Sequence, residues 1–325
     1  MNTGDVLRRA GVVVGIAAGA AGAVYAAERA LVARLRHDPD PDSGSPLVPV
    51  FDEVHDVTTA DGAVLHAISR GEGPPIVLAH GVSLSSRVWA KQFDSLPAAG
   101  FRAVAFDIRG HGESTVGTEG HSLDNLADDL RVVLETLDLR DAVLVGHSMG
   151  GMMIQGFAIR HPDVLRDRVR GLVLLSTSSH MILSDVGVLR GAAERLVGVA
   201  PDVGAIMRRR NLGLLIARFG FGDSPAPSHV EATRQMLAEC SRETIRGAGA
   251  GIVTLDLAGE LPAIHVPTLV VVGSADVLTP PRDARAIAAA MPCARLVEME
   301  GAGHMLMYER ADELDELVID FARRC

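Results

Sequence analysis

A serine stands between two glycines in the stretch GHSMG, residues 146–150, which matches the G-x-S-x-G pattern of a turn that exposes a nucleophile. The pattern alone is weak, because the 325 residues include 34 glycines. Its surroundings are more specific: the apolar run AVLV precedes it and the helix-like segment MGGMMIQGFAIRH follows it. Glycine has no side chain, so strand and helix could approach closely at such a turn. We predict that Ser148 is an exposed nucleophile at the carboxyl edge of a sheet.

An unaided serine hydroxyl is a poor nucleophile, so a base and an orienting carboxylate should accompany Ser148. In sheets with this turn they follow in the order acid, then histidine. Asp276 comes just after the apolar run TLVVVG, and His304 lies in a glycine-flanked loop after the run ARLVEME. Both would therefore lie at the same edge as Ser148, with Asp276 as the acid and His304 as the base. The less well placed competitors are the carboxylates of Asp223, Asp256, Glu260, Asp283 and Glu300 and the imidazoles of His80, His111, His121 and His161.

The oxyanion of a tetrahedral intermediate needs hydrogen-bond donors. Two main-chain N–H groups suit this role: that of Met149, directly after the serine, and that of Val82 in the loop AHGVSLSSRVW. Gly81 would let this loop come close to the reacting carbonyl. The whole set indicates acyl transfer, in which Ser148 attacks a carbonyl and His304 takes its proton. This chemistry requires neither a metal nor an organic cofactor.

Short apolar runs alternate with amphipathic helical segments from Phe51 onward. The stretch EVHDVTTADGAVLHAIS predicts a hairpin that turns at Asp61 and Gly62. Most later runs are continuous in Val, Leu and Ile, which is typical of strands buried on both faces of a parallel sheet. We predict an α/β fold with a mostly parallel eight-stranded sheet and helices on both faces. The later runs are residues 75–80, 102–107, 142–147, 171–176, 268–273 and 294–300, and the helical segments include 123–138, 149–160, 281–290 and 309–323.

No run of the buried-strand type appears from Thr177 to about Pro262. This interval contains helical stretches such as VEATRQMLAEC, interrupted by Gly and Pro. We therefore predict a helical cap over residues 177–262, inserted after the sixth strand. It would separate two parts of the core, residues 51–176 and 263–325.

Residues 10–27, AGVVVGIAAGAAGAVYAA, form 18 positions without a charge. As a helix they would span about 27 Å, close to the roughly 30 Å of a bilayer's hydrocarbon core. We expect residues 1–36 to form an apolar helix that associates with a membrane, in an orientation that the flanking charges leave open. A cleaved export signal or a cytoplasmic form is the alternative. Residues 37–50, which hold four prolines and three aspartates, predict a linker.

The formal net charge of −10 at pH 7 argues against nucleic acid as a partner, because phosphate binding needs a basic face. The three cysteines, Cys240, Cys293 and Cys325, are far apart in sequence and suggest neither a disulfide framework nor a metal cluster. The expected partner is a small-molecule acyl substrate. The oligomeric state stays open.

Four motifs resemble those of the α/β-hydrolase fold family and occur in its order, over about residues 52–324. In that family the segment matching residues 107–114 is usually a structural loop, so the resemblance implies structural roles for Arg109 and His111. The motifs are HG at 80–81 with Trp89 downstream, FDIRGHGES at 106–114, GHSMGG at 146–151, and the pair GSAD and GAGH that ends in Asp276 and His304.

The resemblance implies a serine hydrolase that cleaves carboxylic esters, an esterase or lipase, through an acyl-enzyme on Ser148. Family members that open epoxides or dehalogenate haloalkanes use an aspartate nucleophile, so Ser148 speaks against both activities. Carbon–carbon bond hydrolases, perhydrolases and acyltransferases share the serine, histidine and aspartate and stay open as alternatives. A non-catalytic relative that binds a ligand is the alternative outside the enzymes.

Overall fold

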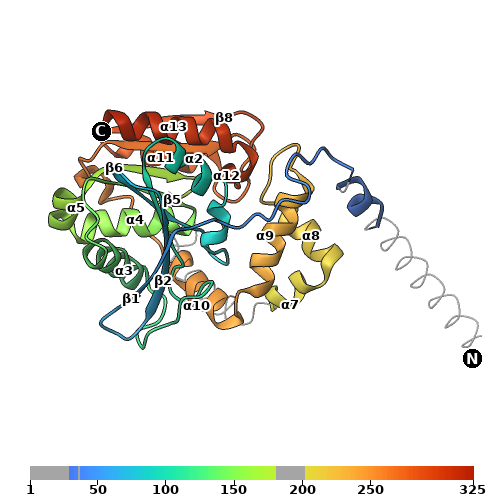
Figure 1. Ribbon diagram of the computed structural model, residues 1–325, viewed down its shortest axis with the longest axis horizontal. Helices are drawn as coiled ribbons and strands as arrows, with labels where there is room; N and C mark the ends of the chain where they lie inside the picture. Colours follow the sequence, from blue (N-terminus) through green and yellow to red (C-terminus); the bar gives the residue numbers. More distant parts are fainter. Residues whose placement is uncertain (1–28, 36, 181–201) are drawn as a thin grey trace, which may run out of the picture.

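An eight-stranded sheet runs through the molecule in the order β1-β2-β4-β3-β5-β6-β7-β8 (Figure 1). The computed structural model describes residues 29–35, 37–180 and 202–325. β2 pairs antiparallel with β1 and β4, and all later neighbours are parallel. The predicted mostly parallel α/β sheet is therefore confirmed. The strands are β1 (Glu53–Thr58), β2 (Val64–Arg70), β3 (Pro75–Ala79), β4 (Arg102–Phe106), β5 (Ala142–His147), β6 (Val169–Leu175), β7 (Thr268–Gly273) and β8 (Ala294–Met299).

The central strands are buried on both faces, which explains their continuous apolar sequences. Every residue of β5 and of β7 is buried. Successive side chains of a strand point to opposite faces, so Leu144 of β5 packs in one apolar core and Val145 in the other. A strand between two cores cannot alternate apolar with polar residues.

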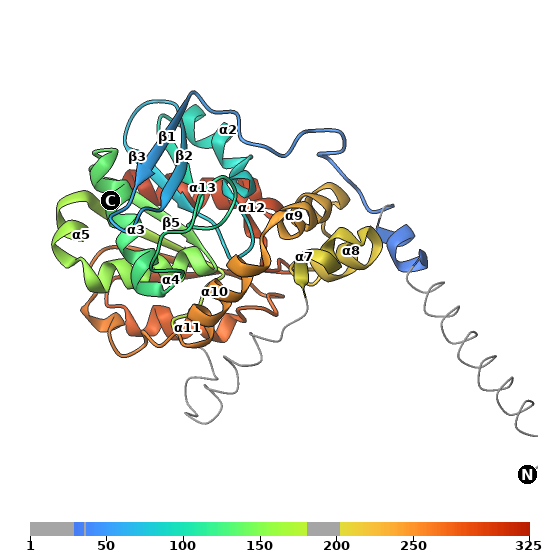
Figure 2. The same cartoon turned by 90° about the horizontal axis from the view of Figure 1, so that it is seen from below.

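Helices cover both faces of the sheet (Figures 1 and 2). Side chains of α3, α4 and α11 belong to one core, and those of α2 and α13 belong to the other. The helices outside the cap are η1 (Ser86–Trp89), α2 (Gln92–Ala98), α3 (Leu123–Thr136), α4 (Met149–Arg160), α5 (Pro162–Arg168), η3 (Leu261–Ala263), α11 (Pro281–Ala290), α12 (Leu306–Glu309) and α13 (Ala311–Arg324).

A helical cap stands between β6 and β7, after the sixth strand as the sequence predicts. The described part of the cap holds α7 (Val203–Arg208), α8 (Arg210–Arg218), α9 (Pro227–Glu239) and α10 (Arg242–Val253), and η3 follows them before β7. Helices α7, α8 and α9 gather at one end of the molecule in both views (Figures 1 and 2). The exact limits of core and cap stay a prediction.

Two aspartates of the predicted linker dock onto the cap and the core. Asp40 accepts hydrogen bonds from the main-chain N–H and the hydroxyl of Ser228, at the start of α9, over 2.9 and 2.6 Å. Asp42 lies 2.7 Å from both His229 of α9 and Lys91, the single lysine of the chain. These contacts place residues 40–42 against the folded domain.

The membrane localisation expected from the sequence is corrected. Residues 10–27, on which it rests, lie outside the described residues. Throughout the ranges that the structure does describe, no helix combines the length and the apolar character needed to cross a membrane. The two longest of these, α3 and α13, have 14 residues each. They span about 21 Å and carry charged side chains, whereas the hydrocarbon core is about 30 Å thick.

Candidate active site

Ser148 occupies a strained turn between β5, which ends at His147, and α4, which begins at Met149. Its φ is 52° and its ψ is −116°, a conformation that non-glycine residues rarely adopt. The turn needs the glycine on its helix side, because a β-carbon on Gly150 would lie 2.3 Å from the main-chain oxygen of Ala79 in β3. The backbone of α4 is therefore in direct contact with that of β3 at Gly150. The local structure is the strand, turn and helix predicted around the serine.

Asp276 and His304 meet at the carboxyl ends of β7 and β8. Nδ1 of His304 lies 2.9 Å from Oδ2 of Asp276, and both side chains are buried. A carboxylate can only accept hydrogen bonds, so Nδ1 carries a hydrogen, and in the neutral imidazole the free electron pair then lies on Nε2. This is the tautomer in which a histidine can act as a general base through Nε2.

The Asp276 carboxylate receives further hydrogen bonds from the turn that follows it. The N–H groups of Leu278 and Thr279 donate to Oδ1 over 2.9 and 3.0 Å, and the Thr279 hydroxyl donates to Oδ2 over 2.9 Å. Burial by itself would raise the pKa of Asp276, but the bonds and charge of His304 and the bonds from Thr279 outweigh it. The pKa therefore lies below its usual value, which keeps the carboxylate ionised beside the imidazole.

The residue before the serine ties the loop of His304 to the turn. Nε2 of His147 donates to the main-chain oxygen of His304 over 2.9 Å, and the two imidazole rings are 4.6 Å apart. Burial is the largest of several effects that hold the pKa of His147 well below its usual value, so this ring is neutral.

In the described chain no hydrogen bond joins the Ser148 hydroxyl to His304. Such contacts are often long until substrate binds.

The two predicted oxyanion donors lie in backbone segments next to Ser148. Met149 is the first residue of α4, where main-chain N–H groups have no partner within the helix. Val82 follows Gly81, on which a β-carbon would lie 3.1 Å from that of Ser148. Across the residues that the structure describes, neither the Met149 nor the Val82 amide donates a hydrogen bond to another protein group.

His80, an alternative base, has a structural environment. Its Nε2 accepts a hydrogen bond from the N–H of Ile108 over 2.9 Å, and its Nδ1 donates to the Gly81 oxygen over 2.7 Å. Burial lowers the pKa of His80 to about 4, more than this bond to Gly81 raises it. Both ring nitrogens are thus occupied in holding the loop that carries Val82.

Arg109 also lies away from the acid–base pair, in a buried ion cluster. Two of its nitrogens each donate to Asp129 over 2.6 Å, and a third donates to Asp61 over 3.0 Å. His111 is placed beside it by a 3.0 Å hydrogen bond from Nδ1 to the Arg109 oxygen. These contacts fit the structural roles that the sequence resemblance implies for both residues.

Three residues that contact this site were missed by the sequence analysis: His147, Thr279 and Glu309. The hydroxyl of Thr279, three residues after Asp276, matches the side-chain turns that Asp and Thr form locally, and this spacing could have revealed it. His147 and Glu309 act on main-chain groups of a segment whose neighbours are set by the fold. No sequence pattern signals such a contact.

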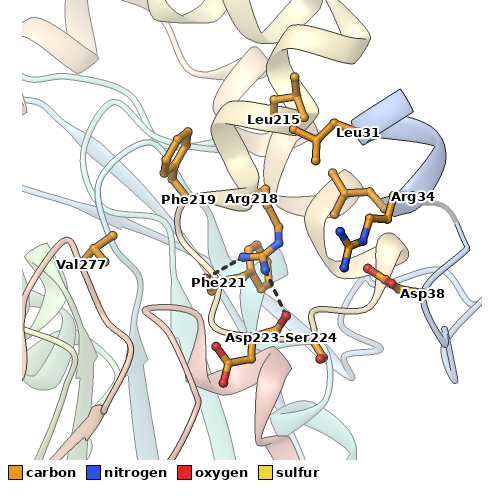
Figure 3. Close-up of a pocket in the computed structure, with 11 residues that line it drawn as sticks. Leu31, Arg34, Asp38, Leu215, Arg218, Phe219, Phe221, Asp223, Ser224 and Val277 are labelled. Atoms are coloured by element: carbon orange, nitrogen blue, oxygen red, sulfur yellow. Dashed lines mark hydrogen bonds between the residues drawn. The ribbon is translucent and has the colours of Figure 1, made fainter. Parts of the chain in front are cut away.

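A cavity of about 710 Å³ opens beside the loop of Asp276; Val277 lines it, whereas Ser148, Asp276 and His304 do not. Figure 3 shows Phe219 and Val277 on one side of it and Leu31 and Arg34, from residues 29–35, on the other. Val277 directly follows Asp276, and the residues Phe219 and Val277 are 69% and 67% exposed. Exposed apolar side chains around a cavity are typical of ligand-binding grooves.

Comparisons with known proteins identify the family to which the fold belongs. A profile of the alpha/beta hydrolase fold matches residues 74–311. The chain is 33% identical over 264 residues to non-heme chloroperoxidase CPO-A1 of Kitasatospora aureofaciens, covering 76% of this chain and 90% of that protein. It is 42% identical over 122 residues to the bifunctional esterase/perhydrolase DCH of Acinetobacter calcoaceticus, covering 37% and 43%. A thermophilic esterase from Thermogutta terrifontis is similar in structure, with a TM-score of 0.71, 28% identity and coverage of 84% and 99%.

Proposed function

Because the chain belongs to the α/β-hydrolase fold family, we propose that it is a serine hydrolase that cleaves carboxylic esters through an acyl-enzyme on Ser148. The observation that carries the proposal is the 2.9 Å hydrogen bond between Asp276 and His304, in a loop that His147 fastens to the turn of Ser148. A serine on such a turn and a histidine oriented by a carboxylate are the parts that acyl transfer requires.

In the proposed reaction the Ser148 oxygen attacks the ester carbonyl carbon while Nε2 of His304 takes the hydroxyl proton. The N–H groups of Val82 and Met149 bind the oxyanion, and each such donor is worth about 3 kcal/mol of barrier. The intermediate collapses as His304 gives its proton to the leaving alcohol. Water then attacks the acyl-enzyme with His304 as the base, which releases the acid and restores Ser148.

Perhydrolysis is the second candidate, and the names of two relatives favour it. One relative is called an esterase/perhydrolase and another a non-heme chloroperoxidase. In this reaction hydrogen peroxide replaces water in the second step, so the acyl group leaves Ser148 as a peracid. The residues and their roles are otherwise the same. The two activities therefore differ in the acceptor and not in the nucleophile.

The apolar rim formed by Phe219 and Val277 favours an ester with an apolar portion over a highly charged one. A panel of p-nitrophenyl esters with acyl chains of increasing length would measure this preference. Peracid formation from the preferred ester and hydrogen peroxide would measure the second candidate.

Fluorophosphonate labelling of the wild type and of Ser148→Ala tests the nucleophile. We expect Ser148→Ala to lose the label and to reduce kcat for p-nitrophenyl butyrate by several orders of magnitude. Ser95→Ala is the matched control, because that hydroxyl lies on α2, where it contacts the oxygen of Gln92 and the carboxylate of Asp315 and not the proposed triad. A label that persists in Ser148→Ala would show that another residue is the nucleophile. A wild type that neither labels nor turns over esters would favour the non-catalytic, ligand-binding alternative.

A further inference from the structure

A short segment of the cap lies directly on the loop that carries His304. The N–H of His304 donates to the oxygen of Gly220 over 2.9 Å, and the N–H of Asp223 donates to the oxygen of Gly301 over 3.1 Å. The approach is so close that a β-carbon on Gly222 would lie 2.1 Å from the Gly301 oxygen. We call residues 220–223 the cap segment and residues 301–305 the base loop.

One carboxylate joins these two stretches of backbone. Glu309, the last residue of α12, accepts a hydrogen bond from the N–H of Gly222 in the cap segment over 2.7 Å. The same carboxylate accepts from the N–H of Gly303 over 3.1 Å and from that of Met305 over 3.2 Å. Gly303 and Met305 are the residues on either side of His304. Glu309 therefore holds the base loop on both flanks of the imidazole while it also holds the cap.

We propose that Glu309 is a positioning residue that locks the cap segment and the base loop into one unit, so that the seating of the cap and the orientation of His304 depend on each other. This inference rests on the proposed function, in which His304 is the base. The lock is possible because one carboxylate can accept several hydrogen bonds at once. An ionised carboxylate has two oxygens with about four lone-pair directions, enough for three main-chain donors.

The three N–H donors and the charge of Arg218 help to stabilise the partly buried charge of Glu309. Burial raises the pKa of Glu309 above its usual value, and the three N–H donors and the charge of Arg218 offset only part of that effect. A half-buried carboxylate in this setting is costly unless it is hydrogen-bonded. Replacement by glutamine would put an NH₂ group, which can only donate, against at least one of the three N–H groups.

The cap segment also forms a wall of the cavity beside the Asp276 loop. Phe221 and Asp223 line it, and Arg218 donates hydrogen bonds to the main-chain oxygens of both, over 2.9 and 3.2 Å (Figure 3). The wall of the cavity thus includes two residues of the segment that Glu309 joins to the base loop, whereas Ser148, Asp276 and His304 do not line it.

The test is Glu309→Gln, assayed for kcat and KM on p-nitrophenyl butyrate with the number of active sites counted by fluorophosphonate titration. We expect kcat to fall by about 10- to 100-fold with KM within threefold of wild type, because small displacements of a catalytic group cost rate more than binding. Glu309→Asp, which keeps the charge but shortens the reach, should give an intermediate kcat. It also serves as the second variant if Glu309→Gln does not fold.

Two control variants separate positioning from general destabilisation. Glu313→Gln removes a carboxylate that is 53% exposed on α13 and should leave kcat unchanged. Val318→Ala removes buried apolar contacts on the same helix and should lower Tm without lowering kcat per active site. A kcat for Glu309→Gln within twofold of wild type, or no lower than that of Val318→Ala, would overturn the proposal.

Amide hydrogen exchange supplies a readout that does not depend on activity. In Glu309→Gln we expect faster exchange in peptides covering both the cap segment and the base loop, and unchanged exchange in α3. Unchanged exchange in both stretches would sink the inference even if the wild type proved to be an esterase. If the wild type had no esterase activity but Glu309→Gln still exchanged faster than the wild type in both stretches, the proposed function would fail and the inference about Glu309 would stand.

Discussion

The imidazole of His147 donates a hydrogen bond over 2.9 Å to the main-chain oxygen of His304. The residue before the proposed nucleophile thus fixes the backbone of the proposed base, although the two lie 157 positions apart in sequence. His147, at the end of β5, thus holds the loop of His304 next to Ser148. Glu309 holds the same loop from the cap side, through the N–H groups of Gly303 and Met305.

Replacement of His147 by phenylalanine keeps a ring in the same space but removes the donor. We expect about a tenfold fall in kcat, because a buried carbonyl oxygen left without a partner costs about 1–3 kcal/mol and the loop can move to recover a bond. His147→Gln, which retains an N–H donor, should lose less. Steady-state kinetics with active-site titration would measure both. Equal rates for His147→Phe and the wild type would refute this role.

The Thr279 hydroxyl should affect the pH dependence of the reaction through Asp276. Its hydrogen bond helps to hold the pKa of Asp276 below its usual value, so Thr279→Val should raise that pKa. The acid limb of the profile of log kcat against pH should then move to higher pH, with a loss of a few-fold at the optimum. Thr279→Ser keeps the hydroxyl and is the control. Identical profiles for Thr279→Val and the wild type would contradict the prediction.

Asp61 in the buried ion cluster should contribute stability that depends on pH. Burial would raise the pKa of Asp61, but hydrogen bonds from Thr59 and from the main-chain N–H of Glu119, together with the charge and bonds of Arg109, lower it to about 2. A carboxyl whose pKa is depressed in the folded state stabilises it above the ordinary pKa, and this contribution is lost as the pH falls through the folded pKa.

We therefore expect Asp61→Asn to reduce the free energy of unfolding at neutral pH, since it leaves part of Arg109 unpaired. The difference in the free energy of unfolding between Asp61→Asn and the wild type should become smaller as the pH falls from about 4 to about 2. Urea unfolding at pH 6, 4 and 3 would measure it. A gap that stays constant or widens over this range would show that the depressed pKa is not the source of the stability.

The elements of the sheet could be predicted because their signals are local. Strands β5 and β7 are mainly apolar because both of their faces are buried. The turn at Ser148 can be recognised from the glycines on either side of the serine. The same local reasoning was wrong for the membrane localisation. An uncharged stretch of sufficient length does not by itself specify a membrane helix. Among the helices that the structure describes, none is long and apolar enough to cross a membrane.

The sequence by itself determined the order of strands and helices, the turn that carries Ser148, and the placement of Asp276 and His304 after the last two strands. Each of these follows from the type and spacing of neighbouring residues. Only the tertiary structure decided that the Asp276 carboxylate is held by Thr279, that His147 binds the backbone of His304, and that Glu309 joins the base loop to the cap. The physical reason is the short range of a hydrogen bond: it forms within about 3 Å, and that precision arises only when the packed core fixes both partners.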